Sequence, residues 1–373
     1  MMRFPCTGTT PVEGFGAFLD RELGEPRRNL RLFSTELATL LAAPNVALVN
    51  SGSSANLAAA LALRERTRRP RALVAGFTFP TTVSALQLAG FEVEVVDTAD
   101  FGMAEYALGA ALGPEVGVVC VTQFLGFSTG IAGLAARAEA AGALVLQDAC
   151  ETMTMVEDGV PVHGFADATT YSFYHPHHLS SFGGGAVVCR DPSLARVVES
   201  VAHWGRACTC HLGNEESCPA PAGEGHQFHY VRAGQNLEMS ELNACFGRFS
   251  LRRFADDEVV RRAHYERLRE AASQLVSTWP LPEHGCSPFV FPFRHPEMAT
   301  LSARLRGRGV EVRTLMGGPI VDQPAFARLA HDGLRGCRAL AANTRLLGIH
   351  QTLPAEDVAA VAEILVDEAR ACR

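Results

Sequence analysis

The sequence predicts an α/β protein built on a mostly parallel sheet that helices cover on both faces. In the first half of the 373-residue chain, short runs rich in Val, Leu and Ala alternate with longer Ala- and Leu-rich segments of helical periodicity. This alternation is typical of βαβ units, whose strands are parallel. Hydrophobic residues make up 47% of the chain and charged residues 20%, so the composition supports a large cored domain and a smaller one.

The expected strands of the large domain are short apolar runs bounded by turns or helices. They are Ala47–Asn50, Ala72–Ala75, Phe91–Val96, Val116–Val121, Ala143–Gln147, Thr169–Phe173 and Gly185–Cys189. Helices are expected around Leu30–Leu41, at Ala55–Arg64, in a segment ending at Leu88 and at Leu134–Ala141. Because ligands of such sheets bind beyond the carboxyl ends of the strands, the residues that follow these strands are the candidate site.

The pattern changes from about Leu251. We expect a charged amphipathic helix, a strand, a helix, a second strand and a terminal helix, at Arg252–Leu275, Pro288–Phe293, Met298–Arg308, Val310–Arg313 and Ala355–Ala371. The chain is therefore divided into an N-terminal arm and helix (1–45), a large domain (46–250) and a small α+β domain (251–373).

The charge distribution excludes some kinds of partner. The chain carries 33 basic and 40 acidic residues, a net charge of −7, without a basic block, so neither nucleic acid nor an anionic membrane is an expected partner. Its apolar runs are far shorter than the ~20 residues of a spanning helix, and the N-terminus has no signal-peptide pattern. We expect a cytosolic protein.

Several polar segments follow the expected strands. Ser51-Gly52-Ser53-Ser54 stands between a strand and an Ala/Leu-rich helix, where backbone N–H groups and hydroxyls bind phosphate. An ordinary N-capped helix is the alternative at this segment. Asp148 ends another strand, and Ser172 is followed closely by His175, His177 and His178.

The chain contains no lysine, because all 33 of its Lys or Arg residues are Arg. An enzyme that holds an aldehyde cofactor through its own lysine is therefore excluded, since arginine stays protonated and is not a usable amine nucleophile.

Eleven cysteines in a cytosolic chain favour metal or redox chemistry over a disulfide scaffold. Cys120, Cys189 and Cys245 stand singly among apolar residues, as ordinary core residues do. Cys208, Cys210 and Cys218 lie close together in a polar segment without periodicity, within an expected Cys-rich loop at 204–220.

With these segments in order, nearly the whole chain resembles the DegT–DnrJ–StrS family of sugar aminotransferases, which have the fold-type-I architecture of aminotransferases that use pyridoxal phosphate (PLP). The motifs that carry the resemblance are Ser51-Gly52-Ser53-Ser54-Ala55-Asn56-Leu57, Phe77-Thr78-Phe79-Pro80-Thr81-Thr82, Asp148-Ala149-Cys150-Glu151, Ser172-Phe173-Tyr174 and Gly234-Gln235-Asn236-Leu237-Glu238-Met239. The aminotransferases have a lysine five residues after the Ser of the Ser-Phe motif, and here that position is His177. The chain thus resembles the branch of deoxysugar 3-dehydrases, which bind pyridoxamine phosphate (PMP) without a covalent link.

The resemblance implies a role for each matching residue. His177 would be the catalytic base, and an imidazole can accept a proton near neutral pH. Asp148 would pair with the pyridinium nitrogen, Phe79 would stack on the ring, and Glu151 would lie beside the cofactor. The phosphate would be held by Gly52, Ser53, Ser54 and Ser172, with Asn236 reaching in from the partner subunit of a homodimer.

The cysteine spacing resembles one kind of 3-dehydrase in particular. CDP-4-keto-6-deoxyglucose 3-dehydrase holds a [2Fe–2S] cluster on four cysteines separated by 57 residues, one and seven, and the same spacings separate Cys150, Cys208, Cys210 and Cys218. The resemblance implies reductive C3 deoxygenation of a nucleotide-linked 4-keto sugar, with electrons from a flavin or iron–sulfur reductase. A structural zinc on the same thiolates is the alternative, giving a cluster-free dehydrase.

Some residues depart from the family pattern. Ser181-Phe182-Gly183, His175-Pro176, Glu151 and Gly317-Gly318-Pro319-Ile320 differ from the usual residues, so the exact sugar stays open. Direct roles for His175 and His178 also stay open, as does the choice between Arg206 and Arg313 as the diphosphate-binding cation. A third hypothesis is a non-catalytic partner protein on an aminotransferase fold.

Overall fold

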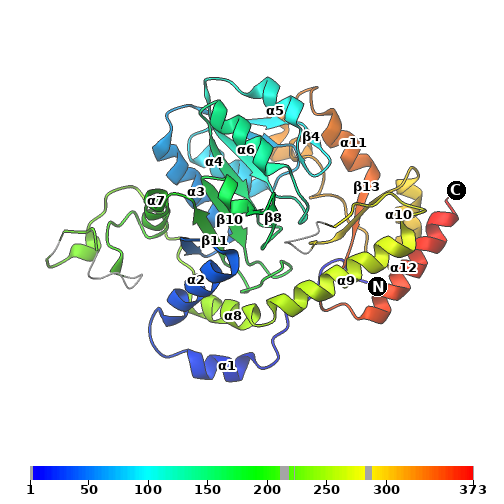
Figure 1. The fold of residues 1–373 in the computed structure, drawn as a ribbon, viewed down its shortest axis with the longest axis horizontal. Helices are drawn as coiled ribbons and strands as arrows, with labels where there is room; N and C mark the ends of the chain where they lie inside the picture. Colours follow the sequence, from blue (N-terminus) through cyan, green and yellow to red (C-terminus); the bar gives the residue numbers. More distant parts are fainter. Residues whose placement is uncertain (1–2, 211–217, 222, 282–287, 373) are drawn as a thin grey trace.

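The computed structural model describes residues 3–210, 218–221, 223–281 and 288–372. Its centre is a seven-stranded sheet of order β1-β11-β10-β7-β6-β2-β3, and only β11 runs antiparallel to its neighbours (Figure 1). The strands are β1 (Val46–Val49), β2 (Arg71–Ala75), β3 (Glu92–Val96), β6 (Val116–Thr122), β7 (Leu144–Asp148), β10 (Ala168–Ser172) and β11 (Gly185–Cys189). The predicted α/β class with a mostly parallel sheet is confirmed.

Both faces of the sheet are covered, because side chains that alternate along a strand enter different cores. In β6, Val118 and Cys120 belong to one apolar cluster, whereas Val119 and Val121 belong to another. All four are fully buried, as expected of a strand that is apolar throughout. The helices of the large part are α1 (Phe15–Glu22), α2 (Arg28–Leu41), α3 (Gly52–Arg66), α4 (Pro80–Leu88), α5 (Glu105–Ala111), α6 (Ile131–Ala140), α7 (Pro192–Ala202) and α8 (Glu241–Leu251).

The C-terminal part packs two long helices beside a two-stranded antiparallel sheet (Figure 1). Its elements are α9 (Phe254–Ala272), β12 (Phe291–Arg294), α10 (Met298–Gly307), α11 (Arg335–Asn343), β13 (Thr344–Leu347) and α12 (Ala355–Arg370). The predicted strand Val310–Arg313 was wrong, because its two ends pair with different segments. Val310 forms an isolated bridge with Phe4, and Arg313 forms one with Leu346.

Smaller elements complete the fold around the sheet. Two-residue strands form the hairpins β4 (Thr98–Ala99) with β5 (Gly102–Met103) and β8 (Val156–Glu157) with β9 (Val160–Pro161). The segment after α7 extends away from the sheet before the chain returns to α8 (Figure 1). Among the described residues, no helix is both long and apolar enough to cross a bilayer. The division into domains stays a prediction.

Candidate active site

A cavity of about 470 Å³ lies where the carboxyl ends of the parallel strands meet the first turns of α3 and α4. Residues that follow β1, β7 and β10 contribute to it, and Phe289, Arg313 and Met316 close it from the C-terminal part. Of the predicted cofactor residues, those that line it are Gly52, Ser53, Phe79, Asp148, Glu151 and Ser172, and the predicted base His177 lines it as well.

The N-terminus of α3 forms a small polar cradle at the edge of this cavity. Ser51 caps the helix by accepting a hydrogen bond from the Ser54 amide at 3.0 Å, and the Ser53 and Thr81 hydroxyls are 2.9 Å apart. A Cβ on Gly52 would lie 2.7 Å from the Cβ of Ser172. Because no side chain fits there, the unpaired amides of the first helical turn stay accessible from the cavity.

Asp148, at the end of β7, is buried and firmly held. Its Oδ2 accepts hydrogen bonds from Asn56 Nδ2 at 2.9 Å and from Thr82 Oγ1 at 2.5 Å, and its Oδ1 accepts one from the Cys150 amide at 3.1 Å. Asn56 is oriented in turn by the Thr170 hydroxyl, which donates to its Oδ1 at 2.6 Å. These three hydrogen bonds hold the carboxyl group of Asp148 in a fixed position.

His177 is fixed in one tautomer. Its Nδ1 lies in hydrogen-bonding contact with the backbone carbonyl of Cys150, and since a carbonyl only accepts, Nδ1 carries the proton and Nε2 has the lone pair. Burial lowers the pKa of His177 to about 4, against the opposing effects of the Cys150 carbonyl and Asp148, while Arg261 lowers it further. The ring is therefore neutral near pH 7, with the lone pair of Nε2 free of a proton.

Three other residues line the cavity. Burial raises the pKa of Glu151 to about 7, and the Asp148 charge adds to this, while a hydrogen bond from the Leu125 amide (3.1 Å) opposes it. Phe79 precedes α4 and is 53% exposed, so its ring presents an open apolar surface to the cavity. Tyr174, which is also exposed, lines the same space.

The other predicted residues lie elsewhere. The Ser54 hydroxyl donates to Asn50 Oδ1 at 2.5 Å, and Asn236 is exposed on a segment whose backbone pairs with His203. His175 Nδ1 lies 2.6 Å from the Thr10 hydroxyl. Reach of Asn236 into a partner's cavity stays a prediction.

The structure separates the two candidate cations. Arg313 lines the cavity, where its Nε donates to Glu311 Oε1 at 2.6 Å. Arg206 instead stacks on Trp204, 4.6 Å from the ring centroid, in the segment after α7. Arg313 is therefore the cation available to a ligand of this cavity.

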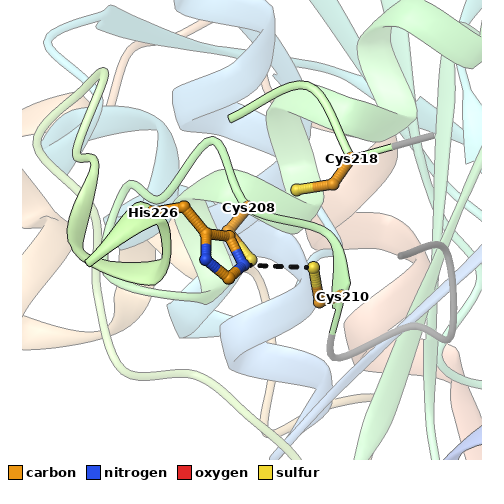
Figure 2. A group of neighbouring side chains, drawn as sticks. All are labelled: Cys208, Cys210, Cys218 and His226. Atoms are coloured by element: carbon orange, nitrogen blue, oxygen red, sulfur yellow. Dashed lines mark hydrogen bonds between the residues drawn. The ribbon is translucent and has the colours of Figure 1, made fainter. Parts of the chain in front are cut away.

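The cysteines predicted as one ligand set occupy two places. Cys208, Cys210 and Cys218 are grouped with His226, their donor atoms all within 4.8 Å of one another (Figure 2). Cys150 is not in that group: it lines the cavity, with its Sγ 2.9 Å from where a Cβ of Gly52 would be. Three of the four predicted ligands are thus grouped within the described residues, and Cys150 as the fourth ligand stays a prediction.

Sequence reasoning missed several residues of these sites. Asn56 and Thr82 stand inside the motifs that were singled out, but only the fold shows that both bind Asp148. Phe289 gives no local signal, because it reaches the cavity from the C-terminal part. His226 stands 16 residues after Cys210, and only the folding of the intervening chain brings the two together.

The fold and this cavity define an α/β protein of the PLP aminotransferase architecture. The chain belongs to the DegT/DnrJ/EryC1/StrS aminotransferase family, whose pattern it matches over residues 18–366. A dTDP-4-dehydro-2,6-dideoxy-D-glucose 3-dehydratase of Saccharopolyspora spinosa is 27% identical to it, over 96% of this chain and 87% of the relative. The lipopolysaccharide biosynthesis protein RfbH of Salmonella typhimurium is 28% identical, over 80% and 75% of the two chains.

Solved structures show the same fold without deciding the reaction. The GDP-4-keto-6-deoxy-D-mannose-3-dehydratase of E. coli, with bound hydrated PLP, superposes with a TM-score of 0.86 at 18% identity, covering 98% of this chain and 100% of its own. The aminotransferase PseC of Helicobacter pylori superposes equally well, with a TM-score of 0.86 at 16% identity and 99% coverage of both chains. The reaction must therefore be argued from the site.

Proposed function

We propose that this chain is a PMP-dependent 3-dehydratase that removes the C3 hydroxyl group of a nucleotide-linked 4-keto sugar. The single observation that carries the proposal is His177, an imidazole held by the Cys150 carbonyl in the cavity of a chain without lysine. The names of the Saccharopolyspora spinosa relative and of the E. coli structural neighbour, both sugar 3-dehydratases, agree with it. Transamination through an internal lysine is excluded by composition.

The residues of the cavity fit PMP. The cradle of Ser51, Gly52, Ser53 and Ser172 suits a phosphate group, and Asp148 supplies a fixed carboxylate for a protonated ring nitrogen. Phe79 offers its open face to the ring. When bound, PMP supplies an amine for the C4 carbonyl and an electron-accepting ring that makes loss of the neighbouring hydroxyl feasible.

His177 would perform the proton transfers. Its Nε2 is unprotonated at neutral pH, and the Cys150 carbonyl holds the ring by Nδ1 so that Nε2 stays available. Glu151, with its raised pKa, retains a proton on a substantial fraction of molecules at pH 7 and is the candidate donor to the departing hydroxyl. Arg313 would bind the diphosphate of the nucleotide.

Reductive deoxygenation with a [2Fe–2S] centre is the second candidate, favoured by the cysteine spacing and by the grouping of three of its four cysteines. It needs a reductase as electron donor. Cys150 is not among the donor atoms grouped within 4.8 Å of one another, and we assign no step to a cluster.

The test is a dehydration assay that needs no reductase. The protein is incubated with PMP and CDP-, dTDP- or GDP-linked 4-keto-6-deoxy sugars in H₂¹⁸O, and mass spectrometry detects label at C3 or a product that lacks one oxygen. Reversible loss of the hydroxyl predicts one of these signals. An amino sugar as the only product, or no change with any substrate although PMP binds, would refute the proposal.

The matched variants are His177→Asn and His175→Asn. The first should abolish exchange and still bind PMP, because Asn fills similar space without a basic nitrogen. The second removes an imidazole that contacts Thr10 outside the cavity, and it should keep activity. Equal activity of His177→Asn and the unmodified protein would exclude His177 as the base.

A further inference from the structure

The N-terminal segment 3–10 runs from the C-terminal part of the molecule to the loop that carries His177, and it passes the active-site cavity on its way. Thr7, midway along the segment, lines the cavity, and Arg313 Nη2 donates to its hydroxyl at 3.4 Å. The sequence analysis treated this segment only as part of an N-terminal arm. The proposed dehydration assigns no role to any of its residues.

The beginning of the segment is fixed to the C-terminal part through its backbone. The amides of Arg3 and Phe4 donate to the Gly309 carbonyl at 2.9 and 3.1 Å. The Glu311 amide donates to the Phe4 carbonyl at 3.0 Å, and Glu311 Oε2 accepts from the Cys6 amide at 2.8 Å. The side chains of Phe4 and Cys6 are buried. Residues 3–6 are therefore held firmly on this part of the fold.

The segment stays in close contact with the C-terminal part as far as Gly8. A Cβ on Gly8 would lie 2.4 Å from His350 Nδ1 and 2.5 Å from Thr352 Oγ1, so the backbone passes directly against these two side chains. The other ring nitrogen of His350, Nε2, is 3.3 Å from the Pro5 carbonyl oxygen. These contacts define the path of the chain up to the residues just before Thr10.

At the end of the segment, Thr10 contacts the loop 174–180, which lies between β10 and β11 and contains His177; we call it the base loop. The Thr10 hydroxyl oxygen lies 3.2 Å from the His175 carbonyl oxygen and 3.1 Å from the Ser180 hydroxyl. His175 Nδ1 is 2.6 Å from the same oxygen. One side chain of the N-terminal segment therefore bonds the base loop near both of its ends.

The base loop has two faces. Pro176 and His177 line the active-site cavity, whereas His175 and Ser180 contact Thr10. Because the loop is short, a movement of the face that is bonded to Thr10 also moves the face that lines the cavity. A proton transfer requires its donor and acceptor within hydrogen-bonding reach, so the placement of this loop matters for the proposed base.

We propose that Thr10 is a positioning residue, whose hydroxyl holds the base loop so that His177 keeps its place in the cavity. The Cys150 carbonyl orients the ring of His177, and Thr10 holds the backbone that carries this ring. The N-terminal segment thereby joins the C-terminal part, which supplies Arg313, to the loop that supplies the base. The effect on catalysis rests on the proposed dehydration, whereas the hold of Thr10 on the loop is independent of it.

The first measurement is the rate of ¹⁸O exchange at C3 in full-length protein loaded with PMP. Thr10→Val keeps the shape of the side chain without its hydroxyl and should lower kcat about tenfold or more, because small misplacements of a catalytic group cost rate steeply. KM and PMP affinity should stay unchanged, since Thr10 does not line the cavity. Thr10→Ser keeps the hydroxyl and should restore kcat, and Thr9→Val is the matched control at an exposed neighbour. His175→Asn keeps the backbone carbonyl that Thr10 contacts, which agrees with its expected activity.

The second measurement is amide hydrogen exchange, which follows the base loop without any turnover. The amides of His177 and Ser181 donate to the carbonyls of Tyr174 and Phe173, at 3.0 and 2.9 Å, so their exchange reports opening of the loop. Thr10→Val should speed exchange of both amides about 2- to 10-fold, as expected for the loss of a neutral hydrogen bond, and leave the amides of α12 unchanged. A role of Thr10 in overall stability alone would instead speed exchange throughout the protein.

The two measurements together decide the proposal. Unchanged exchange of the loop amides in a folded Thr10→Val, unchanged kcat despite faster exchange, or equal losses of rate in Thr10→Ser and Thr10→Val would overturn it. If Thr10→Val does not fold, Ser180→Ala removes the same contact from the loop side and should give the same two changes. If the unmodified protein exchanges no ¹⁸O with any substrate, the proposed dehydration fails, and the amide measurement still decides whether Thr10 holds the loop.

Discussion

The low pKa of His177 gives the most direct test of its role as a base. Burial lowers this pKa from 6.5 to about 4, so the neutral fraction of His177 should fall only from about 100% at pH 8 to about 90% at pH 5. An imidazole with the ordinary pKa would fall to about 3% neutral at pH 5, a roughly thirtyfold loss of base. The two cases differ enough to be separated by a rate measurement.

Other charged groups around His177 must be considered in the same profile. Asp148 raises the pKa of His177 and Arg261 lowers it. Glu151 titrates within the window, because its own pKa is raised to about 7. The rate should therefore change with a midpoint near pH 7 as Glu151 titrates, and this change should disappear in Glu151→Gln.

The assay is the rate of ¹⁸O exchange at C3 between pH 5 and 8, in the unmodified protein and in Glu151→Gln. The expected result for Glu151→Gln is a nearly flat profile down to pH 5. Histidine NMR, assigned by comparison with His177→Asn, should show a ring that stays neutral through the same range. A thirtyfold fall in rate with a midpoint near pH 6.5, matched by titration of the His177 ring, would refute the buried, neutral base.

Two further predictions concern the cofactor cradle. Asp148→Asn should weaken PMP binding about 10- to 100-fold in a fluorescence titration, because a charged hydrogen bond is worth about 1.5–3 kcal/mol. The control Asp167→Asn removes a carboxylate bonded to Val145 and Arg190 and should leave PMP affinity unchanged. Equal affinities of the two variants would contradict the role of Asp148. Gly52→Ala places a Cβ 2.7 Å from Ser172 Cβ, so it should lower the free energy of unfolding by about 1–3 kcal/mol and weaken PMP binding. Gly133→Ala in α6 is the control, because the nearest atom to its new Cβ would be 3.6 Å away, and it should be tolerated. Urea denaturation of both variants checks this, and a fully stable Gly52→Ala that binds PMP normally would contradict the crowding.

Local patterns were sufficient for the sheet and for the motif residues. The strands were predicted within a residue or two because each is a short apolar run between breakers, as at Gly185–Cys189. Helix α8, which packs on α2, was missed. Val310–Arg313 has strand-like residues, yet its pairing partners come from opposite ends of the chain, which no local pattern reveals.

The site was predictable where a residue stands in a motif and unpredictable where the fold supplies a neighbour. His177 and Asp148 were found from their positions after strands, and both line the cavity. Phe289 and His226 were not found, because each meets its partners only through long-range folding. The cysteine spacing describes separations along the chain. It could not show that Cys150 lines the cavity, or that the other three cysteines meet His226.

The backbone of Cys150 connects the two groups on which the proposed chemistry depends. Its amide donates to Asp148 Oδ1, and its carbonyl accepts from His177 Nδ1, so one residue fixes both the carboxylate and the tautomer of the base. These bonds do not involve the thiol. A serine at this position should therefore leave the His177 ring neutral and the Asp148 carboxylate in place, whereas a change of backbone conformation here would misplace both groups at once.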